Sequence, residues 1–387
     1  MTPARAALAA ISALLAGNGP GGSADIVVGA DPASCPGASY STVQAAVDAA
    51  PPGACIRVCA GVYREQVSIG KALRLQGDNG AVLMPAGMVA NTTSLFDGSA
   101  IAAAVLVAGA GPVTLAGITV DGAQNGVAAC APVLVGVMYR NASGRLDEVV
   151  VRNFRLGAGL EGCQSGNGVL VQSGAGGSSR VEVAESSVHD YQKNGVTGNE
   201  AGTELAVRRS VVTGLGPTSG AAQNGIQIGP GARGEVEGCA VANHLYSGCA
   251  SASACSFVAT DILVSGAALA KVARNHAGAS QGGIYLAASG AVVIENEVFD
   301  TSAFDGIVVD GDGNQVAENT VTHSDDAGIF VDGDDNLVSG NRIREAPVGI
   351  WKFAGSTGNV LANNRFSNTA TPVLDPPGVP LAASPFR

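Results

Sequence analysis

Short runs of alternating apolar and polar residues recur along this chain, separated by Gly, Asn and Asp. The runs GIVVDGDGN, from Gly306, and GIFVDGDDN, from Gly328, are nearly identical and start 22 residues apart (328 − 306 = 22). An alternation with a period of two is typical of a half-buried β-strand, and the small polar residues between runs favour tight turns. The pattern therefore predicts many short strands, and no 3.6-residue apolar stripe runs through these segments.

Two sequence markers keep the same spacing. The first is Gly-[Ile/Val]-x-[Val/Leu/Ile], and Asp261-Ile-Leu-Val fills the one large gap between its copies. The second is Asn-x-[Val/Ile/Phe], which stays in step with the first. Two linked markers with one period indicate one structural unit per period. The first marker begins at Gly168, Gly195, Gly225, Gly283, Gly306, Gly328 and Gly349, and the second at Asn296, Asn319, Asn341 and Asn364.

The period fits a solenoid of stacked coils. A unit of about 22 residues is too short for a strand, a crossover helix and a second strand, but it holds about three short strands. Parallel strands stacked about 4.8 Å apart would place the apolar residues in columns inside a rod. The second marker would then stack as an asparagine ladder. A leucine-rich horseshoe is the alternative, and the leucine spacing that it requires is missing.

A capping segment precedes the repeats. Within YSTVQAAVDAAPPGACIRVCAGVYREQVSI, Tyr40–Ile69, the residues Ser41 and Gln44 fit a capping box for a short helix through Ala50, which would close the open end of the rod. With this start and its coil repeats, the chain from Tyr40 to about Thr369 resembles the right-handed parallel β-helix proteins of the pectate-lyase-like superfamily. The resemblance implies an all-β right-handed parallel β-helix of about 22-residue coils with an N-terminal capping helix.

The resemblance is less specific for function. This fold hosts lyases, hydrolases, epimerases and non-catalytic proteins. The stretch Gly61-Val-Tyr-Arg-Glu65 is similar to the start of pectin methylesterases, but the later motifs of those enzymes, with their paired Asp and Arg, do not occur here, which disfavours methylesterase chemistry. What the resemblance implies is a carbohydrate-active protein acting on a polysaccharide.

The first residues read as a targeting segment. Arg5 precedes an apolar run from Ala6 to Ala16 that is too short to span a bilayer, and the small residues Gly22-Ser-Ala24 offer a cleavage site. A disordered Ala-rich start is the alternative. We therefore expect a signal peptide at 1–24, a β-helix domain at 25–370 and a Pro-rich tail at 371–387, in a secreted or periplasmic protein. The eight cysteines fit this oxidising location.

Charge and cysteine spacing limit the partners. The net charge of −11, with only 21 Lys and Arg, disfavours nucleic acid, and no later segment is apolar and long enough for a membrane helix. No Cys-x-x-Cys pair occurs, which disfavours a zinc site. We expect a monomeric protein, and a polyanionic substrate would need local basic residues or a bridging cation.

The coil register suggests how the cysteines pair. Cys130 lies six residues before Gly136 and Cys163 five before Gly168, so the two thiols would meet on one wall of adjacent coils. Cys239 falls in the asparagine column, where we expect it to be buried, and Cys55 remains as its formal partner. The pairing inferred from this register is only one of the 105 connectivities that eight cysteines allow. The pairs that we expect are Cys35 with Cys59, Cys130 with Cys163, and Cys249 with Cys255.

The third residue of the first marker should point outward, and this column turns aromatic towards the C-terminus. Its members are Thr197, Gln227, Leu263, Tyr285, Val308, Phe330 and Trp351. One interpretation is a platform on which sugar rings stack, with Tyr285, Phe330 and Trp351 as binding residues. The alternative is that the Pro-rich tail, 371–387, folds back and covers the rings, because exposed patches of this size are rare in monomers.

A turn before one marker concentrates reactive side chains. His189, Asp190 and Lys193 are suitable types for abstracting a proton beside a uronate carboxyl and for neutralising that carboxyl, so we assign them as catalytic. The insertion from Leu245 to Thr260 would wall the cleft and bring His244 close. The alternative is a solvated corner with Asn194 as part of a ladder. The expected substrate-binding residues here are Tyr191, Gln223, Gln227 and Tyr246.

Acidic residues form a second candidate. Asp305 and Asp326 should stand on neighbouring coils, with Asp325 beside them. This resembles part of the polygalacturonase pattern and would supply a general acid and a general base for glycoside hydrolysis. The next coil has Pro347-Val348 where that family has His-Gly, which weakens the match.

Asp310 and Asp332 should also stack. Two carboxylates about 4.8 Å apart repel by roughly 3.5 kcal/mol at an effective dielectric constant of 20, so they either turn into water or bind a cation such as Ca²⁺. We take Asp310 and Asp332 as the candidate calcium ligands. Three functions thus stay open: a lyase or epimerase around Lys193, a glycoside hydrolase around Asp326, and a non-catalytic carbohydrate-binding or cell-envelope protein.

Overall fold

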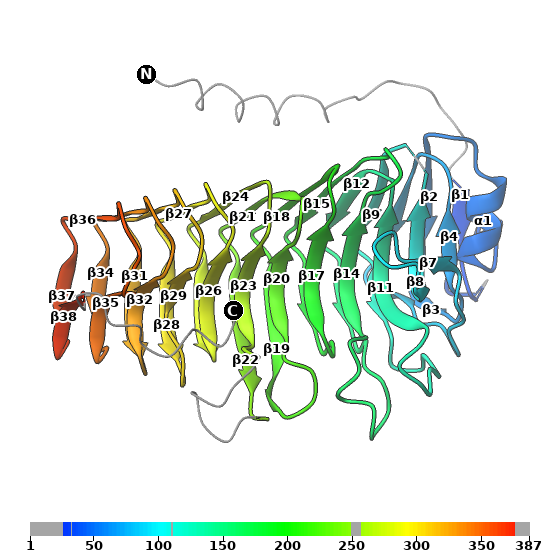
Figure 1. Cartoon of the computed structure of the whole chain (residues 1–387). Coiled ribbons are helices and arrows are strands. Elements are labelled where there is room, and N and C mark those ends of the chain that lie inside the picture. Colours follow the sequence, from blue (N-terminus) through cyan, green and yellow to red (C-terminus); the bar gives the residue numbers. More distant parts are fainter. Residues whose placement is uncertain (1–25, 32, 110, 249–256, 376–387) are drawn as a thin grey trace.

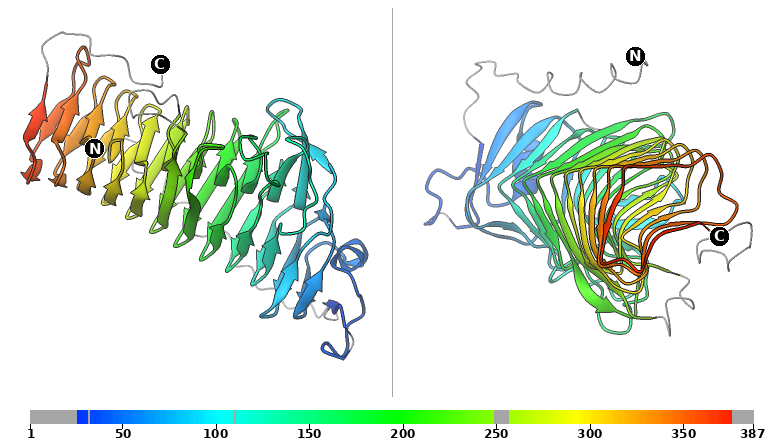
Figure 2. Two further views of the ribbon diagram at one scale, coloured as in Figure 1. Left: turned by 90° about the horizontal axis from the view of Figure 1, so that it is seen from below. Right: turned by 90° about the vertical axis from the view of Figure 1, so that its left-hand side faces the viewer.

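The chain forms a rod of stacked coils, each built from short strands (Figure 1). The computed structural model describes residues 26–31, 33–109, 111–248 and 257–375. Neighbouring strands are parallel in all three sheets, apart from the antiparallel pair β7 and β8, and each coil contributes one strand to each sheet. The view along the rod in Figure 2 shows the coils superimposed on one another. The predicted right-handed parallel β-helix is confirmed.

Three sheets run the length of the rod, and we call them sheets A, B and C. Sheet A contains β1 (Ile26–Val28), β2 (Ala54–Val58), β5 (Leu73–Gly77), β9 (Val113–Ala116), β12 (Gly144–Asp147), β15 (Ser179–Ala184), β18 (Thr203–Arg208), β21 (Arg233–Glu237), β24 (Leu269–Ala273), β27 (Val292–Ile294), β30 (Gln315–Ala317), β33 (Leu337–Ser339) and β36 (Val360–Ala362). Sheet B contains β3 (Gly61–Tyr63), β6 (Ala81–Leu83), β10 (Thr119–Asp121), β13 (Val150–Arg152), β16 (Ser187–His189), β19 (Val211–Thr218), β22 (Ala240–Tyr246), β25 (His276–Ser280), β28 (Glu297–Thr301), β31 (Thr320–Ser324), β34 (Arg342–Arg344) and β37 (Arg365–Ser367). Sheet C contains β4 (Val67–Ile69), β7 (Thr92–Thr93), β8 (Ala100–Ala108), β11 (Val133–Arg140), β14 (Asn167–Gln172), β17 (Asn194–Asn199), β20 (Asn224–Ile228), β23 (Thr260–Ser265), β26 (Gly282–Ala287), β29 (Ile307–Val309), β32 (Ala327–Val331), β35 (Val348–Lys352) and β38 (Thr371–Leu374).

The marker glycines allow sheets B and C to approach each other inside the rod. A Cβ atom on Gly283 would lie 2.4 Å from Cγ1 of Val298, and one on Gly306 would lie 2.5 Å from Cγ1 of Val321. Real side chains do not come this close, so each coil needs glycine in sheet C opposite a branched residue in sheet B. The repeated Gly is therefore a packing requirement of the coil.

The predicted asparagine ladder is present. The Nδ2 of Asn296 donates to Oδ1 of Asn319 at 2.9 Å, and this pattern continues through Asn341 to Asn364 at 3.0 Å per step. Each Oδ1 also accepts a backbone N–H from the coil before it. The ladder satisfies buried turn groups that would otherwise be costly. A second ladder, which the sequence analysis missed, joins Asn314, Asn336 and Asn359.

A short helix covers one end of the rod. Helix α1 (Val43–Ala49) buries Val43, Ala46 and Val47 against the first coils. The predicted capping box is wrong, because Thr42 is the N-cap and its side chain accepts the N–H of Ala45. The remaining first-turn N–H groups of residues 43 and 44 donate to the carboxylate of Glu65 at 2.7 and 2.9 Å.

Two of the predicted disulfides are formed, Cys35–Cys59 and Cys130–Cys163. Cys239 is buried as expected, but it does not pair with Cys55, since both keep free thiols and Cys55 is exposed. Cys249 and Cys255 lie outside the described residues, as does the expected signal peptide at 1–24. The β-helix continues into the segment assigned to the tail, because β38 pairs with β35.

Candidate functional site

His189 and Asp190 lie at the corner between sheets B and C, where β16 turns towards β17. The Nδ1 atom of His189 lies 2.7 Å from Oδ2 of Asp190, and the two side chains are 33% and 42% exposed. A carboxylate on Nδ1 fixes the ring and leaves Nε2 as the nitrogen that can exchange a proton. The pair therefore has the arrangement of an oriented general base.

Lys193 follows in the same turn and is half-buried. Its Nζ donates to the backbone oxygen of Ala222 at 2.6 Å. Burial lowers the pKa of Lys193 to about 8, because the charged ammonium loses hydration. A lysine with such a pKa is partly neutral near physiological pH and can exchange protons.

Side-chain amides tie this turn to two neighbouring loops. The Nε2 of Gln192 donates to the backbone oxygens of Leu160 and Cys163 at 2.7 and 3.1 Å. The Nε2 of Gln223 donates to the backbone oxygen of Tyr191 at 2.6 Å. Gln223 is fully buried, so in this structure it holds the turn in place and presents nothing to a substrate. The turn is thereby rigid, as a preorganised site requires.

Tyr191 points into the rod and belongs to a buried polar network. Its hydroxyl bonds to Nε2 of His244, whose Nδ1 lies 2.6 Å from Oδ1 of Asp261. The same Oδ1 accepts the hydroxyl of Ser280 at 2.5 Å. All four side chains are at most 1% exposed. Tyr191, assigned above as a substrate-binding residue, therefore lies in the interior and is not accessible in this structure.

Asp261 occupies the marker position that is glycine in the other coils from β11 to β35. The interior has room for its side chain because sheet B carries Ala277 at this level, between Val241 and Val298 on the adjacent coils. Burial raises the pKa of Asp261 to about 6, although the hydrogen bonds from His244 and Ser280 act in the opposite direction. The sequence analysis missed this network, and the replaced marker glycine was the signal for it.

Two further predicted binding residues lie near the corner. Gln227 is half-buried on the outer face of sheet C, and its Oε1 accepts from Nδ2 of Asn194 at 3.1 Å. Tyr246 is half-buried at the end of β22, and its ring meets the ring of Phe257 edge to face at 6.4 Å. The corner thus gathers His189, Asp190 and Lys193 with Gln227 on one adjoining strand.

The acidic residues come together as predicted. Asp305 is 6% exposed, and its Oδ1 accepts the N–H of Ala327 at 2.9 Å. Burial and then the negative charge of Asp326 raise the pKa of Asp305 to about 8, and burial also raises the pKa of Asp326. Asp325 is exposed, and its Oδ2 accepts the N–H of Ala303 at 3.0 Å. The arrangement holds one protonated carboxyl next to one that ionises more readily.

The outward aromatic column is closed rather than open. Tyr285, Val308 and Phe330 are 5%, 3% and 8% exposed. The ring of Phe330 meets Trp351 edge to face at 5.4 Å and Phe353 at 6.1 Å. Tyr285 and Phe330 are therefore not accessible for stacking in this structure, whereas Trp351 is half-buried at the end of the column. The alternative in which 376–387 covers them concerns residues outside the described part of the chain.

The candidate calcium ligands sit at the ends of adjacent strands. Asp310 accepts the hydroxyl of Tyr285 on Oδ2 at 2.9 Å, and Asp332 is 7% exposed. No group of three or more His, Cys, Asp or Glu side chains within the described ranges is arranged to hold a metal ion. Calcium binding at this pair of aspartates stays a prediction. Within the same described ranges, no helix is long and apolar enough to cross a membrane.

Solved structures of similar shape share the fold at low sequence identity. A lacto-N-biosidase of Eubacterium ramulus is 12% identical with a TM-score of 0.56, covering 88% of this chain and 67% of that one. The A-module of the mannuronan C-5 epimerase AlgE4 of Azotobacter vinelandii is 14% identical with a TM-score of 0.52, covering 88% and 95%. The Dettilon tailspike protein is 13% identical with a TM-score of 0.51, covering 84% and 65%. These matches show the right-handed β-helix fold.

One protein family matches part of the sequence. Residues 249–376 match the family described as periplasmic copper-binding protein (NosD). No curated protein matches the chain. The described residues of that segment hold no group of three or more His, Cys, Asp or Glu side chains arranged for a metal ion. The match covers the regular C-terminal coils.

Proposed function

We propose that this chain is an exported β-helix protein that acts on a polysaccharide by lyase or epimerase chemistry at the turn from His189 to Asn194. The observation that carries the proposal is the His189–Asp190 pair at 2.7 Å, in the same turn as a lysine with a pKa of about 8. Oriented bases and shifted pKa values concentrate at catalytic sites. The buried network below the turn gives it a fixed support.

The chemistry follows from the residue types. His189, through Nε2, would remove the proton from the sugar carbon next to a carboxylate, and Asp190 would stabilise the resulting imidazolium. Lys193 as an ammonium would neutralise charge that builds up on the carboxylate. In a lyase the electron pair left on that carbon then forms a C=C bond while the bond from the next carbon to the glycosidic oxygen breaks. The departing oxygen takes up a proton from the imidazolium or from water, which gives an unsaturated sugar and a new chain end. Return of a proton to the opposite face of the same carbon gives the epimer.

The fold comparisons support the class of substrate and the location. The names of the similar structures include an epimerase of mannuronan and a lacto-N-biosidase, both acting on glycans. The matching family is described as periplasmic, and two disulfides fit an oxidising compartment. These observations favour a secreted or periplasmic protein.

A glycoside hydrolase at Asp305 and Asp326 is the second candidate. The raised pKa of Asp305, about 8, keeps that carboxyl protonated at neutral pH, while Asp326 lies beside it as the more exposed carboxyl. One protonated and one ionised carboxyl are what glycoside hydrolysis requires. The carboxylate of Asp325, which accepts the N–H of Ala303, would hold the turn next to Asp326 in place.

A glycan panel separates these candidates. The protein would be incubated with neutral and uronate-containing polysaccharides, with detection of unsaturated products, reducing ends and epimerised residues. We expect His189→Gln and Lys193→Met to abolish turnover. His276→Gln is the matched control, because His276 forms a similar pair with Glu297 at 2.8 Å on the same sheet. Its activity should equal that of the wild type.

The outcomes assign the site. A hydrolase would produce reducing ends without unsaturated products. If Asp326→Asn loses this activity and His189→Gln keeps it, the protein is a glycoside hydrolase and the lyase or epimerase proposal is wrong. If no glycan on the panel is converted and all variants bind glycans equally, the rod is a carbohydrate-binding or envelope protein and the catalytic proposal is wrong.

A further inference from the structure

Several arginines of this protein pair with a carboxylate on the same or an adjacent coil. Arg145 pairs with Glu182 and with Asp147 at 2.8 Å, and Arg180 pairs with Glu204 at 2.8 Å. The further arginines paired in this way are Arg57, Arg152, Arg208, Arg209 and Arg274.

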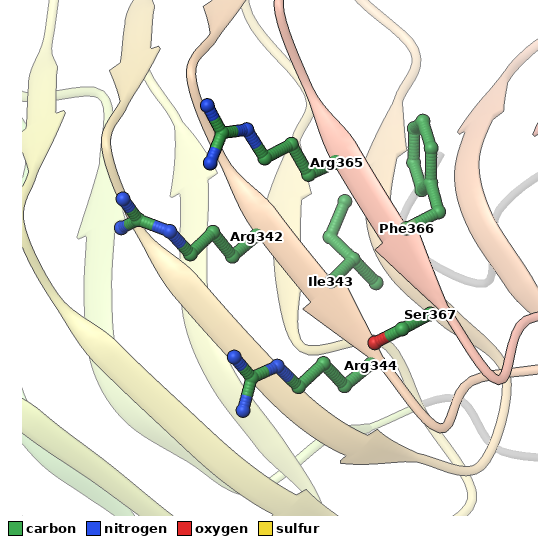
Figure 3. A pocket seen from close by; sticks show the side chains of 6 residues that line it. All are labelled: Arg342, Ile343, Arg344, Arg365, Phe366 and Ser367. Carbon is green, nitrogen blue, oxygen red and sulfur yellow. The ribbon is translucent and has the colours of Figure 1, made fainter.

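On the last two strands of sheet B, arginines lie beside one another instead. Arg342 on β34 stands in register with Arg365 on β37, so two guanidinium side chains start from neighbouring strands at one level. Arg344 lies two residues further along β34, on the same face, next to Ser367. Figure 3 shows the three guanidinium groups reaching to one side of the sheet. No ion pair joins any of them to a carboxylate in the part of the chain that the structure describes.

The cluster surrounds a shallow hollow of about 170 Å³, lined by both strands. Like charges at one level of a sheet repel each other, and no carboxylate of the described residues forms an ion pair with these arginines. Glu345, next in sequence to Arg344, is already bound to His323. An anion between the guanidinium groups would relieve the repulsion and could be held by forked N–H pairs.

The cluster shares an outward column of sheet B with the candidate active site. The register runs without interruption from His189 on β16 to Arg344 on β34, six coils further. At the strand spacing of about 4.8 Å, this is a track of roughly 29 Å along the rod. The positions between them are Thr213, Ala242, Gly278, Phe299 and Thr322. Most of these are small, so an extended chain could lie along the track.

We propose that Arg342, Arg344 and Arg365 bind a carboxylate or sulfate group of an acidic oligosaccharide that extends along sheet B towards His189. The proposal rests on the proposed function for the direction of the chain and adds its substrate class. Nucleic acid and anionic membranes, which present many phosphates over a wide surface, fit less well, because the net charge is −11. Glu345 directly follows β34, Glu318 precedes β31, and Glu297 lies on β28, two strands from β34.

Calorimetric titration of the full chain with size-graded uronate oligosaccharides, at low and high salt, tests the site. We expect affinity to fall with salt and to fall about tenfold for each of Arg342→Gln and Arg365→Gln. Arg209→Gln is the matched control. Arg209 is an exposed arginine in the turn before β19 of sheet B, and it pairs with Glu185 at 2.8 Å. Melting temperatures would establish that each variant is folded.

Parallel titrations identify the source of the anionic group. If sulfated oligosaccharides bind and uronates do not, the group that the arginines recognise is a sulfate. Arginine-dependent binding of either kind of oligosaccharide supports the site. Equal affinity of wild type and both arginine variants for every oligosaccharide overturns the proposal. Arginine-dependent binding of anionic vesicles or single-stranded DNA, with none of oligosaccharides, overturns it as well.

Failure of this site is distinguishable from failure of the catalytic proposal. The titrations are repeated in His189→Gln, which removes the base and leaves the arginines. Arginine-dependent binding without turnover by the wild type supports the site and refutes the catalysis. Turnover with arginine-independent binding and an unchanged KM for long chains refutes the site alone.

Discussion

Two parts of the rod differ in the residues that fill the buried turn column and the marker position. They are the regular coils from Gly282 to Asp375 and the interrupted coils from Asn153 to Gln281. In the regular coils the inner turn carries a continuous asparagine ladder, including Asn319, and the marker position facing sheet B is glycine. In the interrupted coils the same turn column carries Ser210 and Cys239, and Asp261 replaces the glycine.

The difference shows where this fold leaves room for chemistry. A coil that repeats its neighbour satisfies its buried polar groups through identical contacts. Most of its polar side chains are then used in contacts between coils, and few remain for chemistry. A coil with a long loop loses that repetition and must satisfy its buried groups through specific partners, as His244 and Asp261 do. The candidate base, His189, lies on the interrupted side, and the three arginines of the cluster, Arg342, Arg344 and Arg365, lie on the last regular coils.

The largest expected effect comes from breaking the buried network. Asp261→Ala removes the acceptor of His244 and Ser280 and leaves an imidazole buried without its partner. We expect a loss on the order of 3–5 kcal/mol in unfolding free energy, measured by urea denaturation. Asp78→Ala, which removes the exposed partner of Arg57, is the control and should cost less than about 1 kcal/mol. A small loss for Asp261→Ala would mean that the interior rearranges easily.

The acidic pair gives a pH test of the regular coils. The buried sheet C position held by Asp305 is Asn194, Asn224 and Thr260 in the interrupted coils, aligned strand by strand. Because the folded pKa of Asp305, about 8, lies above its ordinary value, its contribution is present in full below about pH 4 and is lost as the pH rises through 8.

Asp305→Asn should remove that pH dependence. We expect the stability of the wild type to fall by a few kcal/mol between about pH 4 and pH 8 relative to the variant, measured by chemical denaturation across that range. Asp325→Asn is the control, because that carboxyl is exposed. Parallel curves for wild type and Asp305→Asn would contradict the raised pKa.

Ca²⁺ tests the regular coils alone, because the candidate ligands Asp310 and Asp332 both lie in them. If they bind Ca²⁺, a concentration 100 times the dissociation constant adds about 2.7 kcal/mol to the stability. Thermal unfolding in millimolar Ca²⁺ and in chelator measures this, with Asp310→Asn as the variant that should lose the response. Identical melting temperatures in both buffers would show that the two aspartates do not bind Ca²⁺.

The smallest expected effect is at the ladder. Asn319→Leu leaves the amides of Asn296 and Asn341 partly unpaired and should cost on the order of 1–3 kcal/mol. Gln315→Leu is the matched control, because that side chain is exposed on the same coil and should change little. Loss of more stability in the control than in the ladder variant would show that the ladder does not stabilise the coil.

The sequence alone determined the fold because each coil repeats a local pattern. Stacking of one coil on the next converts the spacing of Gly306 and Gly328, or of Asn319 and Asn341, directly into columns. The same register predicted the disulfide Cys130–Cys163 and the proximity of Asp305 and Asp326. It failed at the helix cap, where Thr42 and the distant Glu65 replaced the expected box.

Tertiary structure decided which of the candidate side chains is accessible. Tyr191 and Gln223 are polar and lie in a loop-rich stretch, yet both are buried, because the loops around the turn and the missing glycine at Asp261 create an interior that no periodic pattern describes. The unpaired arginines are a property of the register between β34 and β37, which sets like charges side by side. Local repetition therefore specifies the rod, whereas burial and charge pairing depend on contacts between coils that differ from one another.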